Sequence, residues 1–502
     1  MAADGEPNGA SRGTLPEGIF SLLDTDLYKL TMQCGVLKYF PDVEVSYTYH
    51  NRTPNKSLTR RAVRWLQEQI TKLGNIRVSD EELQYLRKTC SYLHDPYLRY
   101  LSEFHLRPSE QVKLSFEPIK DTGSDDDEGD LYIDTKGLWV ETILYEIPLL
   151  ALTSEAYFKF CDRDWTYVGQ EERSYEKGVA LIESGCSFSE FGSRRRRDYH
   201  TQDIVIQGLN RAAEEGMRKG WKGKLSGTSN VHFAMKHGIP PVGTVAHEWF
   251  MAIGAITNDY EHVNEIALRY WIGTFGKGIL GIALTDTFGT STFLEGFKQP
   301  VPKYTSAPPG GATIMASAAS STVPAAESLS GTNPPIEAPP PNGVDGTENR
   351  EPTYAEVFTG VRQDSGDPSG FIKVMREFYD SQNIKERKTI VFSDSLNVER
   401  CIEYRKEAEE AGFYPVFGVG TFLTNDFVRA SDGEKSPPLN IVVKISSAAG
   451  RPAIKISDNI GKNTGDKETV DWVKRRLGYV EHQWEDGDES NRWGKDDGAP
   501  GQ

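Results

Sequence analysis

His247 stands at the head of a helix-like stretch, directly after a small-residue turn, and the candidate chemistry of this sequence gathers around it. The surrounding residues 227–250 read GTSNVHFAMKHGIPPVGTVAHEWF and hold two such turns, GTSN at 227–230 and GT at 243–244. Backbone amides at strand-to-helix turns bind anions, above all phosphates. A histidine in this place can accept a phosphoryl group or act as a general base. The alternative is a histidine that caps or packs.

Further polar residues follow the other apolar runs in the second half of the chain. If these runs are parallel strands, the residues after them meet at one edge of the sheet. Arginines and amide-rich turns suit phosphate, and clustered aspartates suit Mg²⁺ bound to a polyphosphate. The set therefore predicts chemistry on a phosphorylated sugar. Its members are Arg194, Arg195, Arg196, Arg197, Thr228, Thr244, His247, Asp286, Thr287, Arg362, Asp364, Ser365, Gly366, Asp367, Asp394, Ser395, Gly418, Gly420 and Thr421.

Several of these motifs have a structural alternative. Four successive arginines, as in FGSRRRRD, also form solvent-exposed basic patches or nuclear-import signals. Asp286 and Asp394 also suit the N-caps of helices. RQDSGDP at 362–368 is harder to explain in this way, because it is too polar for a core and too varied in residue type for a linker.

The repeating pattern from about residue 141 to 439 predicts an α/β fold. Seven units each combine a short apolar or β-branched run, a polar turn and a helical pattern. Such units imply parallel strands joined by helices, and a closed (β/α) barrel is the economical arrangement. An open doubly wound sheet is the alternative. None of the units opens with GxGxxG, which disfavours dinucleotide binding by that route.

Residues 19–140 predict a separate α+β domain. Leu27, Leu30, Cys34 and Leu37 recur at helical spacing, with Tyr28 near the start of that helix. The acidic DDDEGD segment reads as a solvated loop, with a weak metal site as the alternative. The expected strands are 43–52, 112–118 and 131–137, and the expected helices include 59–73 and 79–88.

Four segments fall outside these two domains. Residues 1–18 predict a disordered tail, and the Pro/Ala/Ser/Gly-rich residues 303–350 predict a disordered insertion in a barrel loop. Residues 440–480 are expected to form a hairpin, with its turn near 449–450, that packs on the N-terminal domain. Residues 481–502 read as a polar tail.

Composition limits the possible functions. The 502 residues exceed one typical domain, and the formal net charge of −16 disfavours general binding to nucleic acid or anionic membranes. The five cysteines are scattered without metal-ligand spacing, which indicates free thiols in a reducing compartment. The N-terminal segment lacks the apolar core of a signal peptide, and the apolar runs are too short to span a bilayer. We expect a cytoplasmic protein, with a nuclear pool left open.

Eight motifs together carry a resemblance to a known family: LLDTDLYKLTM, FGSRRRRD, GTSNVHFA, VGTVAHEWF, TDTFGT, GVRQDSGDP, FSDSL and FGVGTFLTND. Over almost its full length, apart from the insertion and the tails, the chain resembles the nicotinate phosphoribosyltransferases. The resemblance implies a type II phosphoribosyltransferase architecture, with an N-terminal α+β domain and an irregular (β/α) barrel. It implies synthesis of nicotinate mononucleotide and pyrophosphate from nicotinate and 5-phosphoribosyl 1-pyrophosphate, coupled to ATP hydrolysis, in NAD salvage.

The resemblance also implies roles for individual residues. His247 falls on the phosphohistidine, with Asp286 and Asp364 as further catalytic positions. Mg²⁺ is expected to arrive mainly on the pyrophosphate, with Asp286 as a candidate ligand. A homodimer is left open, and in dimeric relatives Tyr28 would reach the neighbour's pocket. The nicotinate-binding positions fall on Tyr28, Arg194, Thr244 and Arg362, and the phosphoribosyl pyrophosphate-binding positions on Arg196, Ser365, Gly366, Asp394, Gly418, Gly420 and Thr421.

One position bears on substrate choice. Relatives that use nicotinamide place an aspartate after the Gly-Thr pair, where this chain has Ser229. An aspartate would repel the carboxylate of nicotinate, so Ser229 favours nicotinate. The alternatives are a nicotinamide-specific enzyme, a non-catalytic nucleotide-binding scaffold, and a phosphosugar aldolase or isomerase. The last would need a lysine at a strand end, whereas Lys444 and Lys455 lie in the predicted C-terminal hairpin.

Overall fold

The computed structural model describes residues 15–53, 55–303, 350–458 and 463–479. Most of the tail expected at 1–18, nearly all of the insertion expected at 303–350, and the whole tail expected at 481–502 therefore lie outside the described residues.

An antiparallel sheet organises the N-terminal part of the chain. Its strands are β1 (Glu44–Asn51), β2 (Leu58–Thr59), β3 (Val112–Pro118), β4 (Glu128–Leu138), β13 (Ile441–Ala448) and β14 (Arg451–Pro452). The order is β14-β13-β1-β4-β2, and β3 also pairs with β4. Buried and exposed residues alternate along β4, because one face of the sheet packs on a core.

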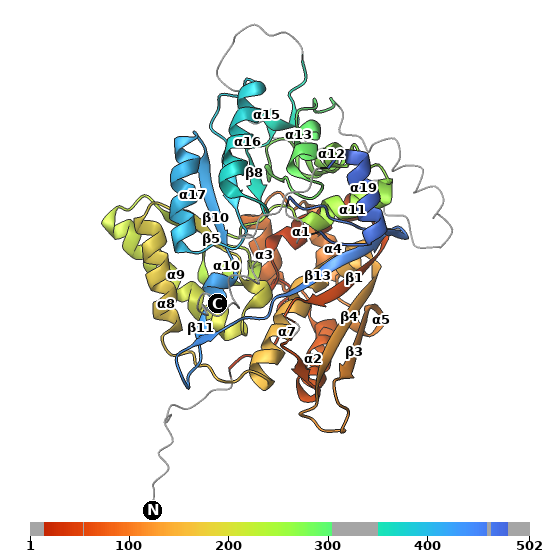
Figure 1. Cartoon of the computed structure of the whole chain (residues 1–502), viewed down its shortest axis with the longest axis vertical. Helices are drawn as coiled ribbons and strands as arrows, with labels where there is room; N and C mark the ends of the chain where they lie inside the picture. Colours follow the sequence, from red (N-terminus) through yellow and green to blue (C-terminus); the bar gives the residue numbers. More distant parts are fainter. Residues whose placement is uncertain (1–14, 54, 304–349, 459–462, 480–502) are drawn as a thin grey trace, which may run out of the picture.

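The C-terminal part of the chain returns to this sheet. β13 pairs antiparallel with β1, from Val45 opposite Ala448 to Asn51 opposite Ile441 (Figure 1). The turn to β14 uses Ala449 and Gly450, both with positive φ. Only 441–452 form the hairpin, because residues 467–477 fold instead into α19 (Lys467–Leu477).

Helices pack around the sheet. They are α1 (Leu27–Tyr39), α2 (Arg60–Lys72), α3 (Asp80–Thr89), α4 (Asp95–Glu103), α5 (Pro108–Gln111), α6 (Trp139–Thr142) and α7 (Glu146–Phe160). The acidic segment near 121–127 faces α2, where Arg60 binds Asp121 at 2.7 Å and Asp127 at 3.0 Å. Its charge is therefore balanced by arginine.

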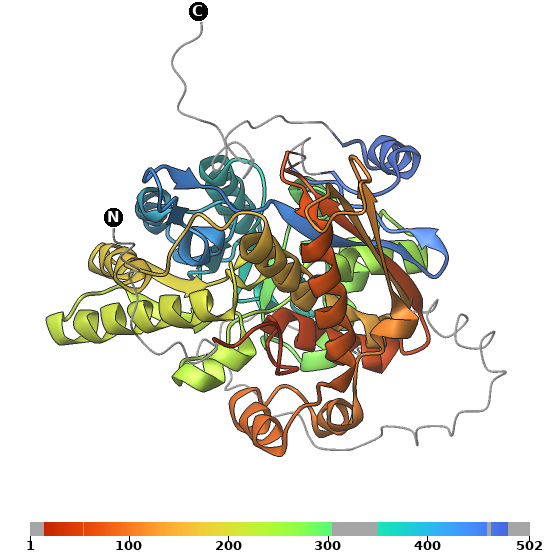
Figure 2. The same cartoon turned by 90° about the horizontal axis from the view of Figure 1, so that it is seen from below.

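A second sheet is wholly parallel. Its strands are β5 (Ser187–Glu190), β6 (Lys224–Thr228), β7 (Ile282–Leu284), β8 (Gly360–Gln363), β9 (Thr389–Phe392) and β10 (Tyr414–Val419), in the order β6-β5-β10-β9-β8-β7. The connecting helices include α8 (Gln170–Glu183), α9 (Tyr199–Lys219), α10 (Val231–His237), α11 (His247–Thr257), α12 (Val263–Phe275), α13 (Thr290–Phe297), α15 (Tyr354–Val357), α16 (Pro368–Ser381), α17 (Val398–Glu410) and α18 (Thr421–Thr424). In both views α8 and α9 lie on the opposite side of the molecule from β3 and β4 (Figures 1 and 2).

The barrel is irregular. Within the described residues β6 does not pair with β7, so the simple closed barrel is wrong. The strand expected before His247 is reduced to a single parallel bridge between Thr228 and Pro241. Pro240 and Pro241 explain this, because proline has no N–H to donate to a strand ladder. A small hairpin, β11 (Phe427–Val428) with β12 (Lys435–Ser436), completes the described strands. Among the described helices, none combines the length and the apolar character needed to cross a bilayer.

Candidate active site

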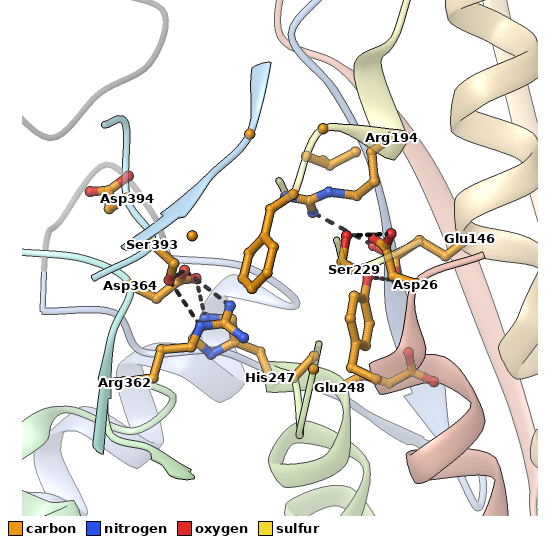
Figure 3. Close-up of a pocket in the computed structure, with 18 of the residues that line it drawn as sticks. Asp26, Glu146, Arg194, Ser229, His247, Glu248, Arg362, Asp364, Ser393 and Asp394 are labelled. Atoms are coloured by element: carbon orange, nitrogen blue, oxygen red, sulfur yellow. Dashed lines mark hydrogen bonds and ion pairs between the residues drawn. The ribbon is translucent and has the colours of Figure 1, made fainter. Parts of the chain in front are cut away.

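A pocket of about 290 Å³ lies where the two sheets face each other (Figure 3). The start of α1, the end of β1, and β13 form one wall, and the carboxyl ends of the parallel strands form the other. Tyr28 lines the pocket of its own chain, so no neighbouring subunit is needed to bring it there. The polar lining residues include Asp26, Tyr28, Arg52, Glu146, Arg194, Ser229, Thr244, His247, Glu248, Arg362, Asp364, Ser393, Asp394, Thr421, Lys444 and Lys455.

His247 is the first residue of α11 and is held from both sides of its ring. Its Nδ1 lies 3.0 Å from Thr287 Oγ1. Its Nε2 lies 3.0 Å from Asp364 Oδ2 and 2.9 Å from Lys455 Nζ. Because the lysine only donates and an ionised carboxylate only accepts, the position of these two groups decides whether Nε2 carries a proton.

The imidazole of His247 is kept neutral. Burial, followed by the nearby charge of Lys455, lowers the pKa of His247 to about 4, although Asp286 and Asp364 oppose the shift. Its side chain is 16% exposed, toward the pocket. A neutral imidazole at the wall of a pocket is suited to nucleophilic attack or proton acceptance.

Two aspartates stabilise this arrangement. Lys455 Nζ lies 3.3 Å from Asp286 Oδ2, and Ser365 donates to the same oxygen. Burial alone would raise the pKa of Asp286, but Lys455 holds it below its ordinary value. Burial likewise opposes ionisation of Asp364, whereas Arg362 at 3.0 Å holds its pKa well below the ordinary range. Both carboxylates are therefore charged.

The same residues are the candidate metal ligands. In the described part of the chain, one group of three His, Cys, Asp or Glu residues has its metal-ligating atoms within 4.8 Å of one another. It consists of His247, Asp286 and Asp364. Their carboxylate oxygens suit Mg²⁺. Lys455, however, contacts two of the three residues and already supplies positive charge there. The group therefore fits a metal that arrives with an anion better than one held by the protein alone.

The other end of the pocket carries Tyr28 and Arg194. Tyr28 donates to Glu146 at 3.2 Å, and Arg194 lies 3.8 Å from the same carboxylate. Ser229 donates to Asp26 at 2.8 Å. Figure 3 shows Arg194, Glu146, Ser229 and Asp26 on one side of the pocket and the group of His247, Arg362 and Asp364 on the other.

Comparisons with known proteins agree with this arrangement. The profile described as the nicotinate phosphoribosyltransferase (NAPRTase) N-terminal domain matches residues 23–154, and that of the NAPRTase family matches 186–306 and 344–481. The chain belongs to the nicotinate phosphoribosyltransferase family. The Saccharomyces cerevisiae nicotinate phosphoribosyltransferase is 42% identical over 480 residues, 95% of this chain and 99% of that protein.

Two further relatives support membership of the NAPRTase family. A Schizosaccharomyces pombe protein with the name "Probable nicotinate phosphoribosyltransferase" is 44% identical over 461 residues, covering 91% of this chain and 98% of its own. A crystal structure from Saccharomyces cerevisiae superposes with a TM-score of 0.79 at 42% identity and covers 93% of this chain and 99% of that one. The α/β fold class, with an N-terminal domain and a parallel-sheet domain, is confirmed.

Among the positions inferred from the NAPRTase resemblance, Arg196 does not reach the pocket. It is fully buried and binds Asp24 through two nitrogens, at 2.8 and 2.7 Å. Its predicted contact with phosphoribosyl pyrophosphate is therefore wrong. The alternative interpretation of the four arginines as a solvent-exposed basic patch is also wrong. Arg195, Arg196 and Arg197 are buried, and only Arg194 is substantially exposed.

Ser365 and Gly366 also lie outside the lining of the pocket. Ser365 packs behind Asp286 and its Oγ lies 2.8 Å from Ser457 Oγ. Gly366 has φ +79°, and a Cβ there would lie 3.2 Å from Asp458. Both residues support the site from behind instead of contacting a ligand in this pocket.

Of the remaining predicted positions, all but Asp286 line the pocket; Asp286 lies behind it, against Lys455 and Ser365. Thr244 lies beside α1, where Thr31 donates to its carbonyl at 2.6 Å. The ends of β9 and β10 bring Asp394, Gly418, Gly420 and Thr421 to the same wall. Neither Asp286 nor Asp394 is a helix N-cap, because Gly289 and Asn397 occupy those positions in α13 and α17.

Sequence reasoning missed three basic residues at the N-terminal sheet: Arg52 directly after β1, Lys444 in β13 and Lys455 after β14. Arg52, Lys444 and Lys455 all line the pocket. Burial, with the charges of Lys455 and Arg52, holds the pKa of Lys444 well below its ordinary value. The only local signal was the repeated Lys-Ile-Ser in VVKISS and AIKISD. The repeat alone does not predict a site, because Lys444 reaches the pocket only when β13 pairs with β1.

Proposed function

We propose that this protein is a nicotinate phosphoribosyltransferase that forms nicotinate mononucleotide and pyrophosphate from nicotinate and 5-phosphoribosyl 1-pyrophosphate, coupled to ATP hydrolysis through a phosphohistidine. The observation that carries the proposal is the position of His247. Its ring is neutral, accessible from the pocket, and held by Thr287, Asp364 and Lys455. Family membership supports the proposed reaction, and the contacts of His247 support its proposed role.

The proposed first step is attack of neutral His247 on the γ-phosphorus of ATP. A P–N bond forms as the P–O bond to the leaving ADP breaks. Lys455, 2.9 Å from Nε2, lies where it offsets the negative charge of the phosphoryl group. Hydrolysis of the phosphohistidine later releases phosphate and returns the imidazole.

The proposed transfer step needs no protein nucleophile. The ring nitrogen of nicotinate attacks C1 of the ribose while the bond from C1 to the pyrophosphate oxygen breaks. Positioning and charge stabilisation carry such a reaction. Arg52 and Lys444 line the pocket, where the guanidinium group of Arg52 neutralises an anionic leaving group and the anion favours the charged form of Lys444. Mg²⁺ bound with the pyrophosphate would add positive charge to the leaving group, and Asp286 and Asp364 are the carboxylates that would hold it.

Nicotinate is favoured over nicotinamide by the surroundings of Ser229. Its hydroxyl donates to Asp26, and Ser193 donates to the same oxygen at 2.7 Å. Burial raises the pKa of Asp26, which reduces its negative charge. Arg194 lines this end of the pocket and offers a guanidinium group to a ring carboxylate. The nicotinamide-specific alternative would need an uncommitted acceptor for the amide nitrogen.

A turnover assay tests the proposal. Purified protein, phosphoribosyl pyrophosphate and Mg²⁺ receive nicotinate or nicotinamide, each with and without ATP. We expect mononucleotide from nicotinate, strongly increased by ATP in the wild type and not increased by ATP in His247→Asn. Product from nicotinamide alone would overturn the specificity. ATP stimulation that survives in His247→Asn would overturn the phosphohistidine. Cytoplasmic location and a homodimer stay predictions of the sequence.

A further inference from the structure

Glu248 directly follows His247 in the first turn of α11, and the reaction proposed above does not use it. Its side chain is 8% exposed. One carboxylate oxygen accepts hydrogen bonds from Tyr47 at 2.6 Å and from Trp139 at 2.8 Å. The other oxygen pairs with the ammonium group of Lys29. All three partners belong to the N-terminal domain, so that domain holds the turn that carries the histidine.

Lys29 connects this turn to the opposite end of the pocket. It is fully buried, and its Nζ also lies 2.6 Å from Glu146, which in turn lies 3.8 Å from Arg194. Although burial opposes it, the charges of Glu146 and Glu248 hold the pKa of Lys29 above its ordinary value. Four side chains of alternating charge therefore connect Arg194, through Glu146 and Lys29, to Glu248 beside His247.

The start of α11 is held by the contacts of the His247 ring, by Arg362 donating to the carbonyl of Val245, and by Glu248. Its N-cap is Ala246, which makes no side-chain capping bond. Glu248 is the acidic residue of the first turn, where a negative charge also favours the helix dipole. A change in the Lys29–Glu248 contact therefore turns the helix start and moves the imidazole relative to Thr287 and Lys455.

We propose that Glu248 is a positioning residue that couples nicotinate binding to phosphorylation of His247 through Lys29 and Glu146. A ligand carboxylate at Arg194 competes with Glu146 for the guanidinium group. Glu146 then attracts the ammonium group of Lys29 more strongly. This changes the ion pair between Lys29 and Glu248, which orients the first turn of α11. Such coupling is reciprocal, so ATP must change nicotinate affinity by the factor by which nicotinate changes ATP affinity. This inference rests on the proposed function of His247.

The test compares the nicotinate KM with and without ATP in the wild type and in Glu248→Gln. Glutamine keeps the shape and can still accept from Trp139, but it loses the ion pair with Lys29. We expect ATP to lower the wild-type KM about fivefold or more, which is the usual size of such coupling. In Glu248→Gln we expect the ratio of the nicotinate KM without ATP to that with ATP to fall to about two or less. The KM for phosphoribosyl pyrophosphate without ATP should stay nearly unchanged.

Arg60→Met is the matched control. It breaks an ion pair of the same domain, with the buried Asp127, away from the pocket. It should lower the melting temperature while keeping the ATP-dependent KM ratio. If Glu248→Gln does not fold, Lys29→Met/Glu248→Gln removes both charges and is judged by the same ratio.

The outcomes separate the two proposals. A folded Glu248→Gln protein, or the folded double variant, that keeps the wild-type ratio overturns the coupling role and leaves the phosphohistidine standing. A wild type whose nicotinate KM does not respond to ATP, while its turnover does, also overturns only the coupling. A wild type in which neither KM nor turnover responds to ATP overturns both.

Discussion

The ammonium nitrogen of Lys455 lies 2.9 Å from Nε2 of His247, although the two residues are 208 positions apart in the chain. One belongs to the segment that returns to the N-terminal sheet, and the other begins a helix of the parallel-sheet domain. This contact places a positive charge where a phosphoryl group would form, and it adds to the larger effect of burial in keeping the histidine neutral.

Replacing this lysine should change the pH dependence of the reaction. In Lys455→Met the histidine loses a charge that lowers its pKa, while the attraction of Asp286 and Asp364 remains. The pKa of His247 should therefore rise from about 4 toward its ordinary value. Protonation then inactivates the histidine at higher pH, so the acid limb of ATP-coupled turnover should move upward by about one unit or more.

A pH–rate profile between pH 4 and 9 measures this shift. Lys159→Met, which removes a surface lysine paired with Glu17, is the control and should keep the wild-type profile. An unchanged acid limb in active Lys455→Met would show that Lys455 does not set the protonation of His247.

Ser229→Asp should weaken nicotinate binding through two effects. The new carboxylate would face Asp26, whose Oδ1 now lies 2.8 Å from the serine hydroxyl, and it would repel the ligand carboxylate. Because two buried carboxylates cannot both ionise freely, one of them takes up a proton near neutral pH. We expect the nicotinate KM to rise about tenfold or more and to rise further at alkaline pH.

Ser229→Asn separates charge from size in this test. It is similar in size to aspartate but neutral, so it should raise the nicotinate KM less than Ser229→Asp does. The ratio of kcat/KM for nicotinate to that for nicotinamide is the measurement. Equal ratios in the wild type and Ser229→Asp would contradict the specificity argument.

Arg196→Met should reduce stability instead of substrate affinity. It leaves Asp24 buried without its bidentate partner, and breaking such a pair costs about 3–5 kcal/mol. Urea unfolding measures the loss, and Asp24→Asn/Arg196→Met should recover part of it. In the folded fraction the KM for phosphoribosyl pyrophosphate should stay within about twofold of wild type. A large rise in that KM with unchanged stability would restore the phosphate-binding role.

Glu155→Gln should stabilise the protein at alkaline pH. Burial and the nearby Asp198 raise the pKa of Glu155 to about 8, and both its oxygens accept from Gly18 N. The unfolded chain loses this proton at much lower pH, so the wild type loses stability progressively up to about pH 8. Glutamine resembles the protonated form and should remove that loss.

Melting temperatures at pH 5 and pH 8.5 test the effect of Glu155. The difference between Glu155→Gln and the wild type should be small at pH 5 and several degrees, about 3–5, at pH 8.5. A difference that does not depend on pH would mean that Glu155 is not protonated in the folded protein.

Local elements were predictable because their signals are local. The helix at 27–39 follows from its apolar spacing, and the strands at 44–51 and 112–118 follow from alternation. Residues 360–363 and 414–419 form strands whose ends carry Arg362, Asp364 and Gly418, as the motifs indicated. The segment before His247 departed from the pattern, because two prolines remove the donors that a strand requires.

The amino-acid sequence by itself determined the family, the class of fold and the motifs that meet at the strand ends. Only the tertiary structure decided how four adjacent arginines divide between the pocket and the core. It also decided that Lys444 and Lys455 join the site. The physical reason is that side-chain direction and burial depend on partners such as Asp24, and on the pairing of β13 with β1, which lie some 400 residues apart. No local periodicity encodes contacts of that range.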